Sequence, residues 1–113
     1  MAPESIIERK YSVASDVWSF GVLCWEIYSL GQRPYHDVGI NAVLSHIIQG
    51  GRLRKPLSCE KVMFVNLKLV YHAVFHYYLR YHLLCSCWDF DADERPSFAE
   101  VHETLEGIAG SSL

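Results

Sequence analysis

Histidine and cysteine side chains in the second half of the chain have types and a spacing that suit a metal ion. His72 and His76 stand four residues apart, so on a helix both imidazoles would reach one zinc ion, and Cys85 and Cys87 follow. However, no glutamate follows His72 as in H-E-x-x-H, and Cys-x-Cys matches finger spacing poorly. We therefore expect a plain helical face here, a buried Cys87 and no metal site.

The sequence predicts a long helix in the first third of the chain. Short oxygen-bearing side chains at 12–16 precede an apolar run that starts at Val17 and stops at Gly31, which predicts a capped helix with a glycine stop. Apolar residues of this run lie on every face of the helix. A surface helix would confine them to one stripe, so we expect a central, fully packed helix.

Two shorter helices are predicted farther along the chain. Asn41 opens an apolar run that ends before Gly50. Near the end, Ser97 and Glu100 form a capping-box pair, and the apolar residues from there to Ile108 fall at helical spacing. This last helix is amphipathic and should pack on the long one. Between them, the basic stretch 52–58 should be an exposed connection.

The composition narrows the class of protein. The chain has 113 residues, half of them apolar, which corresponds to about one small domain. A net charge of -3 argues against nucleic acid and acidic membranes as partners. Four cysteines fall short of a secreted disulfide scaffold, and the N-terminus has no charged leader before an apolar run. We therefore expect a cytoplasmic location.

The stretch 62–84 is dense in apolar and aromatic residues. Lys68, His72, His76 and Arg80 each follow the last by four positions, so on a helix they form one basic stripe. A membrane-spanning helix needs about 20 predominantly apolar residues, and this midpoint carries histidines flanked by charges. An interfacial membrane helix or a calmodulin-type target stays open, but we favour an aggregation-prone insert without membrane association.

Several blocks of the sequence resemble the second half of a protein tyrosine kinase domain. In the order of that family they are Met1-Ala2-Pro3-Glu4-Ser5, Ser15-Asp16-Val17-Trp18-Ser19-Phe20-Gly21-Val22, Trp25-Glu26-Ile27, Cys87-Trp88 and Arg95-Pro96-Ser97-Phe98. They cover roughly residues 1–61 and 85–108. The resemblance implies an all-α fold, a helical bundle equivalent to the lower C-lobe of a kinase. The subfamily, and whether the parent is a receptor or cytosolic, stay open.

The resemblance also implies roles for single residues. Ala2-Pro3-Glu4 resembles the motif that ends the activation segment, whose glutamate forms a buried ion pair with the arginine that corresponds to Arg95. Asp16 resembles the aspartate that binds the catalytic loop, but with that loop absent we expect a plain helix N-cap. The tryptophans should be core residues. The structural kinase residues implied in this way are Ala2, Pro3, Glu4, Asp16, Trp18, Gly21, Trp88 and Arg95.

The motifs that this sequence lacks decide the expected activity. Phosphoryl transfer needs a glycine-rich loop, a nucleotide-binding lysine, the base of His-Arg-Asp and the magnesium ligand of Asp-Phe-Gly, and none is present. Asp89-Phe90-Asp91 imitates Asp-Phe-Gly, but it follows Ala2-Pro3-Glu4 and lacks the glycine. We therefore expect no catalytic, cofactor-binding or metal residue, while ATP and magnesium belong to the parent family.

The chain is thus expected to be an inactive fragment of a tyrosine kinase, residues 1–113 forming a partial domain. Met1 coincides with the methionine that precedes Ala-Pro-Glu in the family, which suggests a fragment or truncated product. Between Val62 and Cys87 there are 24 residues where the family has a short connection, so we expect about 63–82 to be an insertion, such as a translated intron. The alternative is a non-catalytic module that competes for protein partners or substrates of the full-length kinase.

Overall fold

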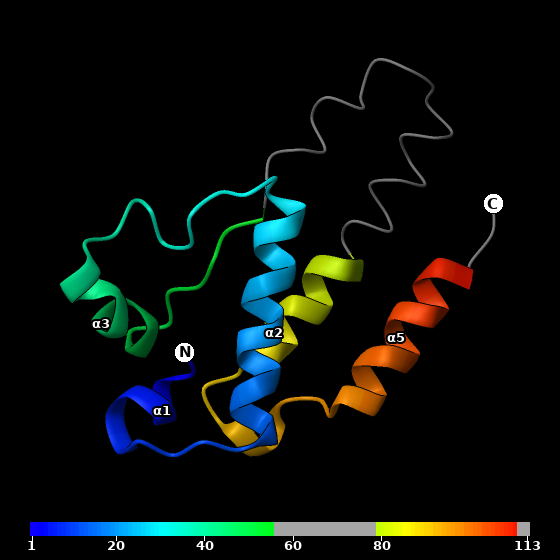
Figure 1. Cartoon of the computed structure of the whole chain (residues 1–113), viewed down its shortest axis with the longest axis horizontal. Coiled ribbons are helices and arrows are strands. Elements are labelled where there is room, and N and C mark those ends of the chain that lie inside the picture. The colour runs from blue at the N-terminus through cyan, green and yellow to red at the C-terminus, as the bar shows by residue number, and fades with distance from the viewer. Residues whose placement is uncertain (56–78, 111–113) are drawn as a thin grey trace.

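The computed structural model of the chain describes residues 1–55 and 79–110. In chain order its elements are α1 (Pro3–Glu8), α2 (Val13–Tyr28), the 3-10 turn η1 (Ile40–Ala42), α3 (Val43–Ile48), a helical segment at 79–87, η3 (Ala92–Glu94) and α5 (Phe98–Gly110). These described residues contain helices and no strand, which confirms the all-α prediction. In Figure 1, α2 runs through the middle, with α1 and α3 on one side and segment 79–87 and α5 on the other.

The start of α2 is fixed by two serines. The Ser12 hydroxyl accepts a hydrogen bond from the Ser15 amide at 3.3 Å, and the Ser15 hydroxyl accepts one from the Ser12 amide at 2.8 Å. This reciprocal pair satisfies two backbone donors at the helix end. The prediction that Asp16 is the N-cap is therefore wrong. Asp16 lies exposed in the first turn, where its carboxylate suits the positive end of the helix.

The predicted glycine stop of α2 is confirmed. Gly31 has a φ of 87°, a left-handed conformation that a glycine adopts without steric cost. Its amide donates to the carbonyl of Glu26 at 2.8 Å, which satisfies one of the carbonyls left open at the helix end. The chain can therefore leave the helix directly after Tyr28.

The exposure of the α2 side chains confirms one sequence prediction and contradicts another. Trp18 and Trp25 are 1% and 4% exposed, so their prediction as core residues is confirmed. Leu23 and Ile27, one turn apart, are 54% and 63% exposed. The prediction of a fully packed helix is thus wrong for the described part of the chain, because the packed elements meet only the faces that carry the buried residues.

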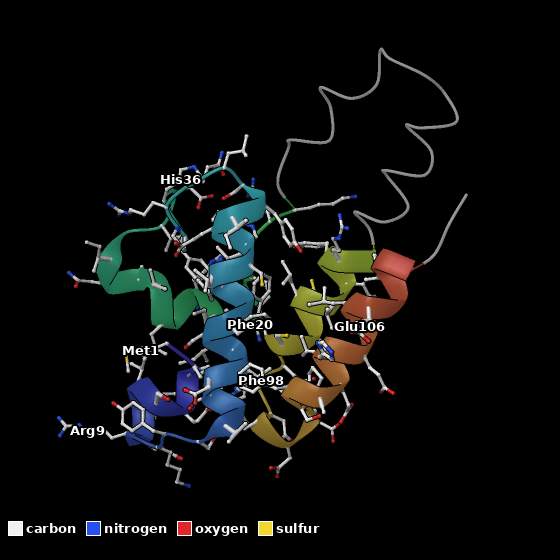
Figure 2. All side chains as sticks on the ribbon, turned by 45° about the vertical axis from the view of Figure 1, so that its right-hand side comes forward. Met1, Arg9, Phe20, His36, Phe98 and Glu106 are labelled. Atoms are coloured by element: carbon white, nitrogen blue, oxygen red, sulfur yellow. The ribbon has the colours of Figure 1, made fainter. Side chains whose placement is uncertain are left out.

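The remaining core comes from the second half of the chain. Segment 79–87 contributes Leu83, Leu84 and Cys87, and α5 contributes Val101. The Ser97 hydroxyl accepts from the Glu100 amide at 3.1 Å, as the predicted capping pair requires. Phe20 of α2 and Phe98 of α5 meet edge to face at 5.8 Å between ring centroids, and Figure 2 labels both. The predicted packing of the last helix on the long one is therefore confirmed.

The predicted insertion at 63–82 falls mostly outside the described residues, as do Lys68, His72 and His76. Its last residues, 79–82, are helical, and the Tyr81 hydroxyl there donates to the carbonyl of Leu53. Whether the stretch is an insertion stays a prediction. Among the described residues, no helix has both the length and the apolar character needed to cross a bilayer.

Candidate functional site

A bidentate ion pair joins α1 to the residue that follows η3. The two terminal nitrogens of Arg95 each donate to one carboxylate oxygen of Glu4, both at 2.8 Å, although the residues are 91 positions apart. The Arg95 side chain is 0% exposed and that of Glu4 is 18% exposed. The ion pair that the kinase resemblance implied is therefore present and nearly removed from water.

The other donors of Arg95 also have acceptors. Its Nε donates to the carbonyl of Asp89 at 2.8 Å, and Nη1 also donates to the carbonyl of Ala14 at 3.1 Å. A buried cation is tolerated only when such partners replace its lost water. Arg95 thereby links α1, the start of α2 and the turn before η3 through one side chain.

The position of Glu4 follows from the residues just before it. Pro3 occupies the first turn of α1, where its missing N–H costs nothing. The carbonyl of Ala2 accepts from the amides of Ser5 and Ile6 at 3.1 and 3.2 Å, and both Ala2 and Pro3 are buried. The buried start of α1 thus directs the Glu4 carboxylate toward Arg95.

Two guanidinium groups lie near the indole ring of Trp18. The Cζ atom of Arg95 is 5.0 Å from the ring centroid and that of Arg52 is 5.3 Å away. Arg52 also donates from Nε to the carbonyl of Trp88 and from Nη1 to the carbonyl of Ile47, each at 2.9 Å. Trp18 is therefore held by cation–π contacts as well as by its burial.

Arg52 is a structural residue that the sequence reasoning missed. The stretch 52–58 was predicted to be exposed, but in its described part Arg52 is half-buried and Leu53 is 3% exposed. The prediction is wrong for Arg52 and Leu53, whereas Arg54 is exposed as predicted. Arg52 is drawn inward by its hydrogen bonds to carbonyls of α3 and of Trp88. The one available signal was Leu53, an apolar residue within a basic run.

A missing side chain at Gly21 allows close packing between α2 and Trp88. A Cβ at Gly21 would lie 2.8 Å from Nε1 of Trp88 and 3.0 Å from Cβ of Cys87, closer than packed atoms come. Trp88 is 1% exposed, and its Nε1 finds no acceptor among the described residues. Glu4, Trp18, Gly21, Trp88 and Arg95 together are called the junction below.

The electrostatics of the junction follow from the ion pair. The hydrogen bonds from Arg95 hold the pKa of the Glu4 carboxyl below its ordinary value of 4.5, although partial burial acts in the opposite direction. Burial raises the pKa of the Cys87 thiol to about 11, so this thiol stays neutral at physiological pH. Glu4 is thus a charged structural group, and Cys87 is a buried apolar one, as predicted.

The aspartates that imitate a magnesium motif serve the local backbone. The amide of Asp91 donates to Oδ1 of Asp89, and the amide of Asp93 donates to Oδ1 of Asp91, both at 3.0 Å. These contacts cap the turn that leads into η3. Within residues 1–55 and 79–110, no three metal-ligating side chains gather at one point. His72 and His76 lie outside the described residues.

Comparison with known proteins gives the family. A model of protein tyrosine and serine/threonine kinases matches residues 1–76. The chain is 40% identical to protein sevenless of Drosophila melanogaster over 109 residues, which is 96% of this chain and 4% of that protein. It is 38% identical to fibroblast growth factor receptor homolog 2 of the same fly over 109 residues, 96% of this chain and 9% of that protein.

A third relative extends the comparison to a vertebrate. The chain is 37% identical over 110 residues to tyrosine-protein kinase receptor TYRO3 of Xenopus laevis, which is 97% of this chain and 11% of that protein. The chain thus spans about a tenth or less of the length of these three relatives. Their similarity runs over nearly all of this chain and agrees with the geometry of the junction. The chain therefore belongs to the family of protein tyrosine and serine/threonine kinases, as a part of a tyrosine kinase domain.

Proposed function

We propose that this chain supplies the scaffold of the lower C-lobe of a tyrosine kinase and has no phosphotransferase activity alone. The complete domain of such a kinase transfers the γ-phosphate of ATP to protein tyrosines. The supporting observation is the ion pair of Glu4 with Arg95, whose charged atoms bind one another and backbone carbonyls. Groups engaged in this way can hold an element in place but have little capacity left to act on a substrate.

The scaffold acts through the position of α1. By its resemblance to the family, the motif Ala2-Pro3-Glu4 ends the activation segment of the complete domain. Fixing Glu4 to Arg95 therefore anchors that segment to the last helices. Breaking the anchor would let the segment move, and positioning errors of about 1 Å can cost about 100-fold in rate.

The chain alone should neither bind ATP nor transfer phosphate. Its 113 residues contain no glycine-rich phosphate loop, no His-Arg-Asp and no Asp-Phe-Gly, which supply most of the transition-state stabilisation in this reaction. We would titrate the chain with ATP and magnesium in a calorimeter and then assay radiolabel transfer to a tyrosine peptide. A complete tyrosine kinase domain is the positive control.

The expected result is no saturable heat and no transfer above the background without protein. Binding at micromolar ATP would contradict the proposal. So would transfer that is lost in the variants Asp89→Asn or Asp91→Asn, because these aspartates would then bind the metal rather than cap a turn.

A second function from another class is competition for protein partners of the full-length kinase. The exposed apolar side chains of Leu23 and Ile27 on α2 favour this alternative. A pull-down with the full-length kinase and its substrates as prey separates the two functions. Capture that is lost in Leu23→Glu but kept in Ser19→Glu, an exposed site on the same helix, would support the competing module. Two of the relatives are named as receptors, whose kinase domains are intracellular. We therefore place the chain in the cytoplasm for both proposed functions.

A further inference from the structure

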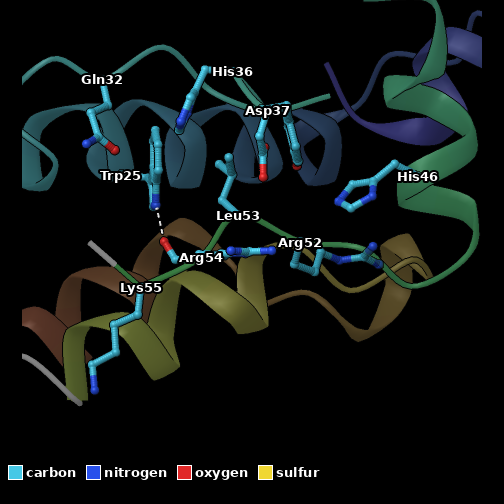
Figure 3. Close-up of a pocket in the computed structure, with 10 residues that line it drawn as sticks. Trp25, Gln32, His36, Asp37, His46, Arg52, Leu53, Arg54 and Lys55 are labelled. Atoms are coloured by element: carbon cyan, nitrogen blue, oxygen red, sulfur yellow. Dashed lines mark hydrogen bonds between the residues drawn. The ribbon is translucent and has the colours of Figure 1, made fainter. Parts of the chain in front are cut away.

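The two sides of α2 differ in what covers them. On one side Trp25 is buried, and its Nε1 donates to the carbonyl of Arg54 at 2.6 Å, which Figure 3 shows as a dashed line. Leu23 and Ile27 stand two positions before and after Trp25, so helix geometry places them about 160° around the axis from it. The segment 52–55, which covers Trp25, therefore does not cover Leu23 and Ile27.

The other side of α2 carries a row of apolar side chains. Val13, Leu23 and Ile27 are each more than half exposed, and Phe20, which is half-buried beside Phe98, completes the row. The successive spacings of seven, three and four residues are typical of the contact face between two packed helices. Single exposed apolar residues are common on soluble proteins, whereas a contiguous row marks an interaction surface. Val13, Phe20, Leu23 and Ile27 are called the α2 face below.

Opposite charges stand near the two ends of the α2 face. Asp16 lies in the first turn of the helix, and Arg33 lies in the loop that follows its end. Both residues are exposed, and within residues 1–55 and 79–110 neither side chain has a hydrogen-bond or ion-pair partner. Two parallel copies of the helix would bring like charges together, whereas an antiparallel pair would bring Asp16 of one copy beside Arg33 of the other. The charges therefore favour an antiparallel pair.

The same arrangement matches the apolar side chains. If a two-fold axis passes midway between Leu23 and Ile27, each Leu23 lies opposite Ile27 of the other copy. Asp16 and Arg33 stand nine and eight positions from that level, so the charged and the apolar contacts fit one register. An axis midway between Phe20 and Leu23 would instead place the Asp16 carboxylate against the apolar side chain of Ile27, which is unfavourable. The first register is therefore the better one.

We propose that the α2 face binds a second copy of this chain, as a symmetric and antiparallel pair of α2 helices. The apolar contact of Leu23 with Ile27 lies at its centre, and an ion pair of Asp16 with Arg33 lies at each end. One pair of helices is a small contact compared with the about 1,200–2,000 Å² that stable interfaces bury, so we expect a dissociation constant of about 10–100 µM. The proposal does not depend on the proposed kinase function, because none of these residues belongs to the junction.

The first test is the mass of the full chain in solution. Sedimentation equilibrium from about 1 to about 500 µM should show a reversible change from monomer to dimer. The dimer should be the largest species, because a two-fold pair leaves no copy of the α2 face free. A monomer at every concentration would overturn the proposal. Growth beyond the dimer would overturn it as well, since an aggregating surface behaves in that way.

A matched pair of variants locates the interface. Leu23→Glu places a charge at the centre of the pair and should raise the dissociation constant of the dimer at least tenfold. Ile48→Glu is the control, because Ile48 of α3 is 53% exposed against 54% for Leu23 and lies outside the α2 face, and it should leave the constant unchanged. Equal losses in both variants would show non-specific association and would overturn the proposal. A monomeric parent that Leu23→Glu destabilises would also overturn it, because another part of the same chain would then cover this face.

The exposed charges test the orientation of the pair at little risk to the fold, which far-UV circular dichroism checks. Asp16→Lys and Arg33→Glu should each raise the dissociation constant about threefold or more, because an exposed ion pair is lost twice in each dimer. The double variant exchanges the two charges and should return the constant to within about twofold of the parent. Single variants that dimerise like the parent, or a double variant as weak as the single ones, would contradict the antiparallel pair and overturn the proposal.

Discussion

The junction and the outer face of α5 contain the same two features in opposite surroundings. Each has a carboxylate beside a basic side chain, Glu4 with Arg95 at 2.8 Å and Glu106 with His102 at 3.1 Å. The side chains of the first pair are 18% and 0% exposed, and those of the second are 71% and 73% exposed. Pairs with similar distances therefore differ in what they contribute to the free energy of unfolding, because water can replace a lost partner only at the surface.

The second shared feature is a glycine inside a helix. Gly21 in α2 faces Trp88 and Cys87, whereas a Cβ at Gly107 in α5 would meet, within the described residues, no atom within 4 Å beyond its own stretch of helix. Glycine lowers helix stability in both places, but only at Gly21 does the fold gain close packing in exchange. The surroundings of a glycine thus decide whether it raises or lowers the stability of the fold.

The largest effect is expected when the buried cation is removed. Arg95→Gln leaves the Glu4 carboxylate and the backbone carbonyls of Ala14, Asp89 and Phe90 without their donors, and should lower the free energy of unfolding by about 3–5 kcal/mol. Because small domains are stable by only about 5–15 kcal/mol, this variant should be close to unfolding. Urea titration followed by far-UV circular dichroism measures the change.

His102→Gln is the matched control for this variant. It removes an exposed imidazole one helical turn from its carboxylate partner and should change the free energy of unfolding by less than about 0.5 kcal/mol. If both variants lost the same free energy of unfolding, the buried pair of the junction would contribute no more than the exposed pair of α5.

The glycines should respond to alanine with opposite signs. Gly21→Ala forces a methyl group against Trp88 and should destabilise the fold by about 1–3 kcal/mol, despite the better helix propensity of alanine. Gly107→Ala gains that propensity without a clash and should stabilise by up to about 1 kcal/mol. Thermal unfolding of both variants beside the parent tests this pair. A stabilised Gly21→Ala variant would mean that Trp88 does not pack on α2 as described.

The smallest expected effect is on the pH dependence. The pKa of Glu4 is lowered in the folded state, so its contribution to stability is complete above its ordinary pKa of 4.5 and is lost as the pH falls through the lower folded value. The parent should therefore lose more stability than Glu4→Gln between about pH 6 and about pH 3. Urea midpoints across this range measure the difference. Parallel curves for the two proteins would show that Glu4 titrates as if it were free.

The sequence predicted the contacts of the junction only where it resembled a family. Nothing in local periodicity brings residues 91 positions apart together, so the pairing of Glu4 with Arg95 came from the order of motifs. The cap of α2 could be predicted to within a few residues, but the choice of Ser12 over Asp16 depends on the reciprocal bonds with Ser15. Local patterns thus predict the presence of a helix more readily than the residue that caps it.

The errors concerned surroundings that no local pattern contains. Arg52 is half-buried because it donates to the carbonyl of Ile47, five positions before it, and to the carbonyl of Trp88, which only the fold brings close across 36 positions. In the same way, the apolar residues of α2 were recognised, yet Leu23 and Ile27 are exposed in the described chain. Hydropathy identifies residues that can be buried, while tertiary neighbours decide which of them are.

The most direct test of the junction is a double-mutant cycle on its ion pair. The free energies of unfolding would be measured for the parent, Glu4→Gln, Arg95→Gln and the double variant under one set of conditions. If the pair holds α1 to the C-terminal elements as described, the coupling energy should be about 2 kcal/mol or more, as for other close charge pairs removed from water. A coupling energy within about 0.5 kcal/mol of zero would contradict the central claim, since residues without contact contribute additively.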